Sequence, residues 1–194
     1  MIDLPARPFY FLRHGETAAN VADLVSGATD DALTARGLAQ AEAAAAAFAG
    51  IPLAAIWHSP LTRARRTAEA VSRATGAPLH PLAGLAERNW GAWEGQPRAV
   101  LVREATPPGG EGPEAFRARV RAALSCITAP FPVLIVGHSG TQREIHALLS
   151  DRAFRRPGNA RPMRWAPAPD GHWICTELSP NRQSRPLESR LANR

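Results

Sequence analysis

Short apolar runs alternate with longer segments of helical periodicity along most of this 194-residue chain. Residues 9–12, 54–58 and 133–136 have the composition of short strands, and the last run is the β-branched and leucine-rich pattern of a strand buried on both faces. Segments with apolar residues at helical spacing lie between them. This alternation predicts an α/β fold, with a largely parallel sheet flanked by helices.

The expected helices have recognisable boundary residues. Thr34 is expected to cap one helix, and Ser59 to cap a second that stops before Gly76. Thr141, with Glu144 three residues later, has the pattern of a capping box. Helices are therefore expected over residues 34–49, 59–75 and 113–130, and from just beyond residue 138 to 149.

Composition indicates one domain and restricts how phosphate could be bound. With 194 residues and 45% hydrophobic side chains, the chain is long enough for a single domain, 1–194, with a sizeable core. All 23 basic residues are arginine. The absence of lysine excludes Schiff-base chemistry and the phosphate-binding lysine of a Walker P-loop. Phosphate recognition would have to come from guanidinium groups and backbone amides.

Residues 152–194 carry the whole net charge of +6, because positive and negative residues balance in the part before them. The proline- and arginine-rich residues 152–170 are expected to form a loop, and residues 172–178 a late strand. A solvated basic tail is the simpler explanation of the charge, so nucleic acid is not expected as a partner. Trp165 and Trp173 suit a homodimer interface as well as a core.

The sequence shows no sign of a membrane span, a secretory signal or a cysteine-based site. No apolar run approaches the roughly 18 residues of a membrane span, and the N-terminus lacks a basic start followed by a long apolar stretch. Cys126 and Cys175 are far apart and form no C-x-x-C pair, so neither a disulfide framework nor a cysteine zinc site is indicated. We therefore expect a soluble cytoplasmic protein.

Two histidines stand where predicted strands end. His14 follows the first strand, between Arg13 and Gly15, and His138 follows the strand of residues 133–136. In parallel sheets, ligands bind outside the carboxyl ends of the strands. His138 also precedes a predicted helix N-terminus, whose free amides favour an anion, and Gly15 would let the backbone approach a ligand. A lone histidine could simply bond a backbone carbonyl, but two at one edge of the sheet indicate an anion site.

Three arginines stand in the first two turns of the helix expected after Ser59. Cations there oppose the helix dipole by about 0.3–1 kcal/mol each, so a compensating anion or carboxylate is expected. We assign Arg63 to an anion pocket. For Arg65 and Arg66 we expect pairing with Glu69 or exposure to solvent.

Residues 85–95 form no clear helix or strand, yet they hold two tryptophans and two carboxylates. Loops of this kind often line functional sites. Alternatively, the tryptophans cover the core and both Glu87 and Glu94 are solvated.

These residues resemble the histidine phosphatase superfamily, in the branch that contains cofactor-dependent phosphoglycerate mutases, bisphosphatases and α-ribazole phosphatase. The resemblance covers roughly residues 9–150. It rests on an ordered series of motifs: LRHGET at 12–17 with Asn20, SG at 26–27, LT at 33–34 with Gly37, SPL at 59–61, RA at 63–64, TA at 67–68, Glu87, Gly91, WEG at 93–95, PGGE at 108–111 and VGH at 136–138.

The resemblance implies a three-layer α/β/α sandwich of the phosphoglycerate mutase type and a catalytic role for each matching residue. His14 would be the nucleophile that carries phosphate, and Glu87 the acid/base, with His138 beside the phosphoryl group. The phosphate-binding residues would be Arg13, Arg63, Asn20, Gly15 and Ser139. No metal and no cofactor is implied. Ser139 stands where the phytase-like branch has an aspartate acid, so Glu87 is the better candidate for that role.

Hydrolysis is favoured over transfer between substrates. The residues after His138 differ from the glycine-asparagine of the glycolytic mutases, and the chain is without their extra basic lid segment. We therefore expect a metal-independent phosphomonoesterase that acts through a phosphohistidine on a small phosphorylated metabolite. A phosphoglycerate-type mutase, and a non-catalytic binder of phosphorylated ligands or nucleic acid, are the alternatives.

Overall fold

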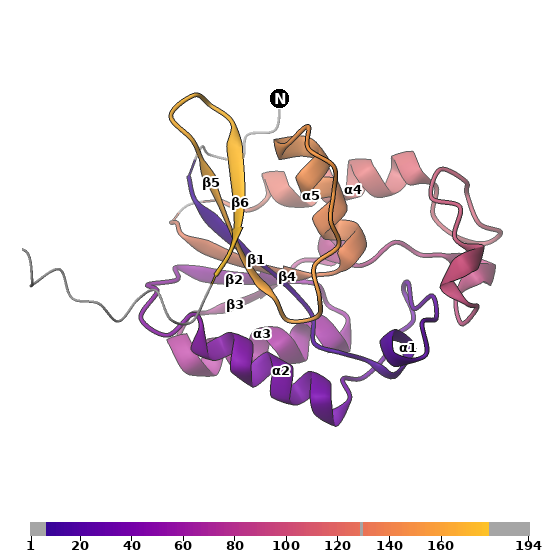
Figure 1. Ribbon diagram of the computed structural model, residues 1–194, viewed down its shortest axis with the longest axis horizontal. Coiled ribbons are helices and arrows are strands. Elements are labelled where there is room, and N and C mark those ends of the chain that lie inside the picture. Colours follow the sequence, from indigo (N-terminus) through magenta and orange to yellow (C-terminus); the bar gives the residue numbers. More distant parts are fainter. Residues whose placement is uncertain (1–6, 129, 179–194) are drawn as a thin grey trace, which may run out of the picture.

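The computed structural model describes residues 7–128 and 130–178, and its centre is a six-stranded sheet in the order β3-β2-β4-β1-β5-β6 (Figure 1). Neighbouring strands among β1 to β4 pair in parallel, whereas β5 pairs antiparallel with β1 and with β6. The strands are β1 (Phe9–Arg13), β2 (Ala55–His58), β3 (Leu79–Pro81), β4 (Val133–Gly137), β5 (Pro162–Pro167) and β6 (Trp173–Glu177). The predicted α/β fold with a mostly parallel sheet is confirmed.

Helices cover both faces of the sheet and give the three expected layers. Helices α2 and α3 pack together on one face, and α4 and α5 lie on the other (Figure 1). The helices are α1 (Ala18–Val21), α2 (Ala35–Ala46), α3 (Thr62–Thr75), α4 (Pro113–Ser125) and α5 (Ser139–Leu149), with short 3-10 turns η1 (Ala83–Leu85), η2 (Gly91–Trp93) and η3 (Arg98–Val100).

Alternation along β1 builds the core on both sides of the sheet. Tyr10 and Leu12 belong to the apolar cluster under α2 and α3, whereas Phe9 and Phe11 belong to the cluster under α4 and α5. All four are buried, and full burial of such side chains contributes roughly 1.5–3 kcal/mol each. The strand that carries His14 is therefore held rigidly from both faces.

The prediction that residues 152–170 form a loop is wrong for β5. This strand pairs with β1, where Trp165 lies opposite Phe9, and its Trp165 side chain is 1% exposed. Pro162 and Pro167 stand at the two ends of the strand, the positions at which proline is tolerated in a sheet. The two prolines thus mark the ends of a strand, although the prolines of this segment had suggested a loop.

Helix boundaries predicted correctly include the start of α4 at Pro113, the end of α5 at Leu149, and the two described next. Thr34 caps α2, where its side chain accepts a hydrogen bond from the Gly37 amide. Gly76 ends α3 with a φ of 74°, a left-handed conformation that glycine adopts without strain.

Two predicted caps were wrong because other groups occupy the side chains concerned. Helix α3 begins at Thr62, and Asp30 from a distant loop accepts hydrogen bonds from the Thr62 amide and hydroxyl, while Ser59 lies before the helix. Helix α5 begins at Ser139, and the Thr141 hydroxyl donates to the carbonyl of Leu85 at 3.2 Å. The expected capping box with Glu144 therefore does not form.

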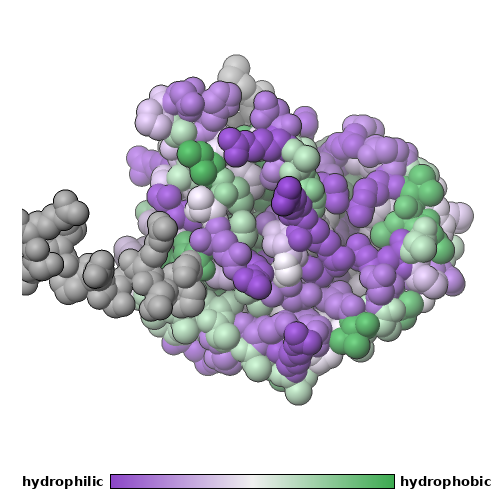
Figure 2. Space-filling model, in the orientation of Figure 1, coloured by the Kyte–Doolittle hydropathy of each residue, from purple (hydrophilic) through white to green (hydrophobic). Residues whose placement is uncertain are grey.

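Within residues 7–128 and 130–178, no helix is long and apolar enough to cross a membrane. Hydrophilic side chains gather over the middle of the face in Figure 2. Of the basic region over residues 152–194, the structure describes residues 152–178, and residues 179–194 lie outside the described part of the chain.

Candidate active site

The two predicted histidines meet at the carboxyl end of the sheet. Strands β1 and β4 are parallel neighbours in which Arg13 lies opposite Gly137, so the residues that follow them emerge side by side. The imidazole rings of His14 and His138 have centroids 5.2 Å apart and planes inclined by 55°. Both rings are buried, at 5% and 0% exposure.

His14 is held in the tautomer that a nucleophile requires. Its Nδ1 lies 2.7 Å from the carbonyl oxygen of Gly15. A carbonyl can only accept a hydrogen bond, so Nδ1 carries the proton and Nε2 keeps its lone pair. Burial, followed by the positive charges of Arg63 and Arg13, lowers the pKa of His14 well below its ordinary value. The ring is therefore neutral at physiological pH.

His138 is fixed by a hydroxyl group. Its Nε2 lies 2.7 Å from the Ser59 Oγ, and its buried Nδ1 has no hydrogen-bond partner among the described residues. Burial, and then the charge of Arg63, lowers the pKa of His138 as well. Ser59, which we expected to cap a helix, instead orients this histidine.

A small cavity of about 50 Å³ opens beside His14. A single water needs roughly 10–15 Å³ on this measure, so the cavity has room for a group of a few heavy atoms, such as phosphate. Its lining includes His14, Arg13, Arg63, Asn20, Ser139 and Glu87, which are all predicted site residues.

Backbone carbonyls hold the two predicted phosphate-binding arginines in place. Arg13 donates to the carbonyl of Pro157 at 3.0 Å, and Arg63 donates to those of Gly27 and Thr29, both at 2.6 Å. Neither guanidinium has a carboxylate partner within the described ion pairs, and the Nε of each is buried without a hydrogen bond. Burial lowers the pKa of both, with Arg156 as the second cause for Arg13, where the pKa falls to about 9. Both therefore stay charged at neutral pH and are available to an anion.

Glu87 lies at the edge of this cavity, with its carboxylate held by two amides. Oε1 accepts from the Arg88 amide, and Oε2 accepts from the amide of Gly140 in the first turn of α5, both at 2.9 Å. The positive end of a helix thus faces this carboxylate. Glu87 can exchange a proton with a group bound in the cavity.

Gly15 does not line the cavity, although we predicted that it would bind phosphate. Its amide donates to the Thr67 Oγ1 at 3.0 Å, so it is not free for a ligand. Glycine is required here for a different reason: a side chain at this position would collide with the backbone carbonyl of Gly37 in α2. The Gly15 backbone therefore lies close to helix α2, whereas we expected it to lie close to a bound anion.

Several residues at or beside the cavity were not among the predicted phosphate-binding residues. The Asn159 amide donates to the carbonyls of His14 and Gly15 and to the Asn20 Oδ1, which fixes the backbone at His14. Arg98, Arg103 and Arg156 also line the cavity. The abundance of arginine between residues 152 and 161 was the only signal for Arg156, and none singled out the other three.

The two arginines that we expected to pair outside the site do so. Arg65 and Arg66 form ion pairs with Glu69, at 2.8 and 3.1 Å. The start of α3 therefore has one cation, Arg63, that lines the cavity, and two that share the single carboxylate of Glu69 outside it.

In the described part of the chain, no group of three or more histidine, cysteine, aspartate or glutamate side chains is arranged to hold a metal ion. One imidazole (His14), five guanidiniums and one carboxylate line a cavity the size of a phosphoryl group, and the fully buried His138 lies behind His14 without lining the cavity. This arrangement suits binding and transfer of a tetrahedral anion.

Comparisons with known proteins define the class. The model of the histidine phosphatase superfamily (branch 1) matches residues 9–163. Since this match spans most of the chain, the protein belongs to the histidine phosphatase superfamily, and the resemblance inferred from the sequence motifs is confirmed. With the relatives described next, the match identifies a phosphatase that acts on a small phosphorylated metabolite.

Individual relatives include both phosphatases and a protein named as a mutase. Adenosylcobalamin/α-ribazole phosphatase of Salmonella typhimurium is 35% identical over 148 residues, which cover 68% of this chain and 73% of that protein. The crystal structure of α-ribazole phosphatase from Shigella flexneri superposes with a TM-score of 0.76 at 29% identity, covering 89% of this chain and 96% of that one. The protein named "Probable phosphoglycerate mutase GpmB" of Salmonella choleraesuis is 32% identical over 136 residues, or 62% and 63% of the two chains.

Proposed function

We propose that this chain is a metal-independent phosphomonoesterase in which His14 carries the phosphoryl group and Glu87 is the general acid and base. The observation that carries the proposal is the hydrogen bond from Nδ1 of His14 to the Gly15 carbonyl, which leaves the Nε2 lone pair available beside a phosphate-sized cavity. The depressed pKa of His14 supports it, because only the neutral ring is nucleophilic.

In the first step, Nε2 of His14 attacks phosphorus and the bond from phosphorus to the departing alkoxide oxygen breaks. Glu87 in its protonated form gives its proton to that oxygen, so an alcohol leaves and the glutamate becomes a carboxylate. Arg13 and Arg63 bind the phosphoryl oxygens, and their fixed carbonyl anchors mean that little reorganisation is needed as charge develops.

In the second step, water attacks the phosphohistidine. The carboxylate of Glu87 takes a proton from the water, the new phosphorus–oxygen bond forms, and the bond to Nε2 of His14 breaks. His138 lies beside His14, and Asn20 and Ser139 line the cavity as further phosphate contacts. Phosphate is released and both catalytic groups return to their starting state.

Three accompanying proposals come from the sequence: a cytoplasmic location, a single domain over residues 1–194, and no nucleic-acid partner. Homodimer formation stays open, although Trp165 is buried against Phe9 within this chain, with ring centroids 6.2 Å apart, and is not free for an interface. The names of the relatives make α-ribazole 5′-phosphate a reasonable first substrate to assay.

The test is to trap the intermediate. Rapid quenching with a ³²P-labelled aryl phosphate should give acid-labile label on the wild type and none on His14→Ala, with turnover lowered by roughly 10⁴-fold or more. His80→Ala, which changes a histidine outside the cavity, is the matched control and should behave as the wild type. Loss of activity on adding a chelator, or labelled His14→Ala, would refute the mechanism.

The mutase alternative is favoured by one observation, the similarity to a protein named as a phosphoglycerate mutase. A mutase keeps its phosphohistidine until an acceptor substrate arrives, whereas a phosphatase loses it to water within a turnover. The lifetime of the trapped label in the absence of acceptor therefore distinguishes the two functions.

A further inference from the structure

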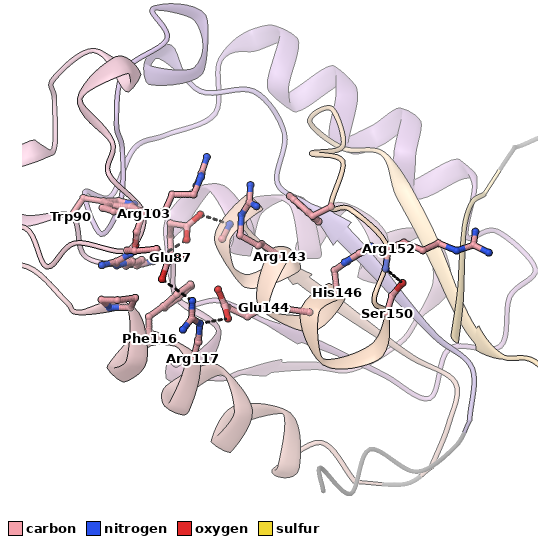
Figure 3. A pocket seen from close by; sticks show the side chains of 16 residues that line it. Glu87, Trp90, Arg103, Phe116, Arg117, Arg143, Glu144, His146, Ser150 and Arg152 are labelled. Carbon is pink, nitrogen blue, oxygen red and sulfur yellow. Dashed lines mark hydrogen bonds and ion pairs between the residues drawn. The ribbon is translucent and has the colours of Figure 1, made fainter. Parts of the chain in front are cut away.

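A second cavity, of about 380 Å³, is also lined by Glu87, and Figure 3 shows the side chains around it. It shares Glu87, Trp90, Arg103 and Gly140 with the phosphate cavity, so the two spaces adjoin at the proposed acid. Its volume falls within the range of roughly 300–1,000 Å³ that is typical of small-molecule sites. The phosphate cavity, at about 50 Å³, is too small to hold more than the phosphoryl group.

The position of Glu87 decides which part of a substrate enters this second cavity. If Glu87 gives its proton to the departing oxygen, as the proposed function requires, that oxygen lies next to the carboxylate. The rest of the alcohol then extends away from phosphorus, into the space beyond Glu87. We call this space the leaving-group cavity.

Aromatic side chains form part of the wall of the leaving-group cavity. Trp90 and Phe116 are buried, at 8% and 3% exposure, and Phe154 lines the same space. The Arg88 guanidinium lies 4.1 Å from the centroid of the Trp90 ring and holds it in place. Such walls favour a flat, ring-containing group over a small polyol.

Most of the charged groups here are already engaged. Arg88 donates to three backbone carbonyls, those of residues 103, 105 and 111. Arg117 pairs with the carboxylates of Glu104, Glu114 and Glu144. Figure 3 shows Arg117 beside Glu144. These groups support the wall and leave few donors for a ligand.

Three arginines of the lining, Arg103, Arg143 and Arg152, have guanidinium groups without a hydrogen bond or ion pair to the described residues, and of these only Arg143, on α5, has a buried Nε without a partner. Its guanidinium lies 4.4 Å from the centroid of the Phe154 ring, and it makes no hydrogen bond or ion pair with the described residues. The Nε of Arg143 is buried and without a partner, which is costly unless a ligand supplies an acceptor. A planar guanidinium held against an aromatic ring suits a carboxylate attached to a ring.

We infer that Arg143 recognises an acidic group on the leaving alcohol, and that the substrate is a phosphomonoester of a ring-containing alcohol that carries a carboxylate or similar anion. This inference rests on the proposed function, because it takes Glu87 to mark the position of the departing oxygen. It goes further by assigning the substrate class and a specificity-determining residue.

The experiment compares two substrates that differ in one charge, 4-carboxyphenyl phosphate and 4-carbamoylphenyl phosphate. The wild type should prefer the carboxylate in kcat/KM by roughly 10- to 100-fold, the usual effect of a charge-assisted hydrogen bond. In Arg143→Gln the ratio should fall close to one. Arg121→Gln, an exposed helical arginine outside both cavities, is the matched control and should keep the wild-type ratio.

Because the readout is a ratio within one protein, partial loss of folded enzyme does not affect it. A second measurement needs no variant: with phosphate present, 4-hydroxybenzoate should inhibit the wild type more strongly than 4-hydroxybenzamide. A wild type that hydrolyses both esters without preference, or Arg143→Gln that retains the preference, would overturn the inference alone. A wild type that hydrolyses neither ester would instead count against the proposed function.

Discussion

Glu87 and Glu94 stand seven residues apart in one irregular segment, yet their carboxylates have different surroundings. Glu87 accepts two amide hydrogen bonds and borders both cavities. Glu94 accepts from the amides of Ala28, Thr29 and Trp90 and from the Thr29 hydroxyl, and it lines neither cavity. The Glu87 carboxylate is accessible to a group bound in either cavity, whereas the Glu94 carboxylate links two loops through its hydrogen bonds.

Glu94 receives four hydrogen bonds, whereas Glu87 receives two. In this segment, the number of hydrogen-bond donors around each carboxylate therefore distinguishes the structural glutamate from the one proposed to react. Glu94 fixes the loop of residues 26–29, and this loop supplies the two carbonyls that position Arg63. Its influence on the phosphate is therefore indirect. Glu87, in the proposed mechanism, acts on the substrate directly.

The largest expected effect is on turnover by a Glu87 variant, and its size should depend on the leaving group of the substrate. Glu87→Gln removes the acid, so turnover of an alkyl phosphate should fall by roughly 10²- to 10⁴-fold. The loss should be much smaller for 4-nitrophenyl phosphate, whose departing oxygen needs little protonation. Steady-state kinetics with both esters measures the contrast. Equal losses with the two esters would remove Glu87 from the acid role.

A second prediction concerns Glu94→Gln, which keeps the shape but loses the charge and one acceptor oxygen. We expect about 2 kcal/mol less stability to unfolding, because hydrogen bonds to charged groups contribute roughly 1.5–3 kcal/mol. Because Arg63 loses its fixed position, the inhibition constant of inorganic phosphate should rise by about tenfold, equally with either leaving group. Urea unfolding and phosphate inhibition test both expectations. A dependence on the leaving group like that of Glu87→Gln would break the distinction between the two glutamates.

A third prediction concerns the pH dependence of stability, which tests the two histidines independently of both carboxylates. Burial lowers the pKa of His14 and His138 in the folded chain, so the unfolded chain binds more protons once the pH falls below about 6.5, the ordinary histidine value. Stability should be level above that pH and decline below it, by up to about 1.4 kcal/mol per pH unit for each histidine. Unfolding curves without phosphate should show this decline in Glu87→Gln and Glu94→Gln alike. A decline that begins only below pH 5 would assign it to carboxylates.

The strand ends and their histidines could be predicted because the signal is local. The run at residues 133–136 is apolar throughout, and both β1 and β4 end within one residue of the predicted position. Parallel pairing then brings His14 and His138 together without any further information. The segment around Glu87 was harder, since nothing in the sequence shows how many donors each glutamate receives.

The errors came from side chains whose partners lie far away in sequence. Thr141 was read as a cap, but its hydroxyl binds the carbonyl of Leu85, 56 residues earlier. Asn159 fixes the His14 backbone across 145 residues and had no local pattern to mark it. Local propensity cannot report contacts of this range, and these contacts complete the site.

The contact between Gly15 and Gly37 has a consequence for how the site would look to genetics. A methyl group on either residue would strike the other segment's main chain, and the strand carrying His14 would have to move away from α2. A saturation-mutagenesis screen for activity should therefore rank both glycines with the reactive residues, although neither touches the ligand cavity. Loss of activity on substitution at these two positions would reflect the close packing of α2 against the segment that follows β1, and could be misread as evidence of a catalytic role.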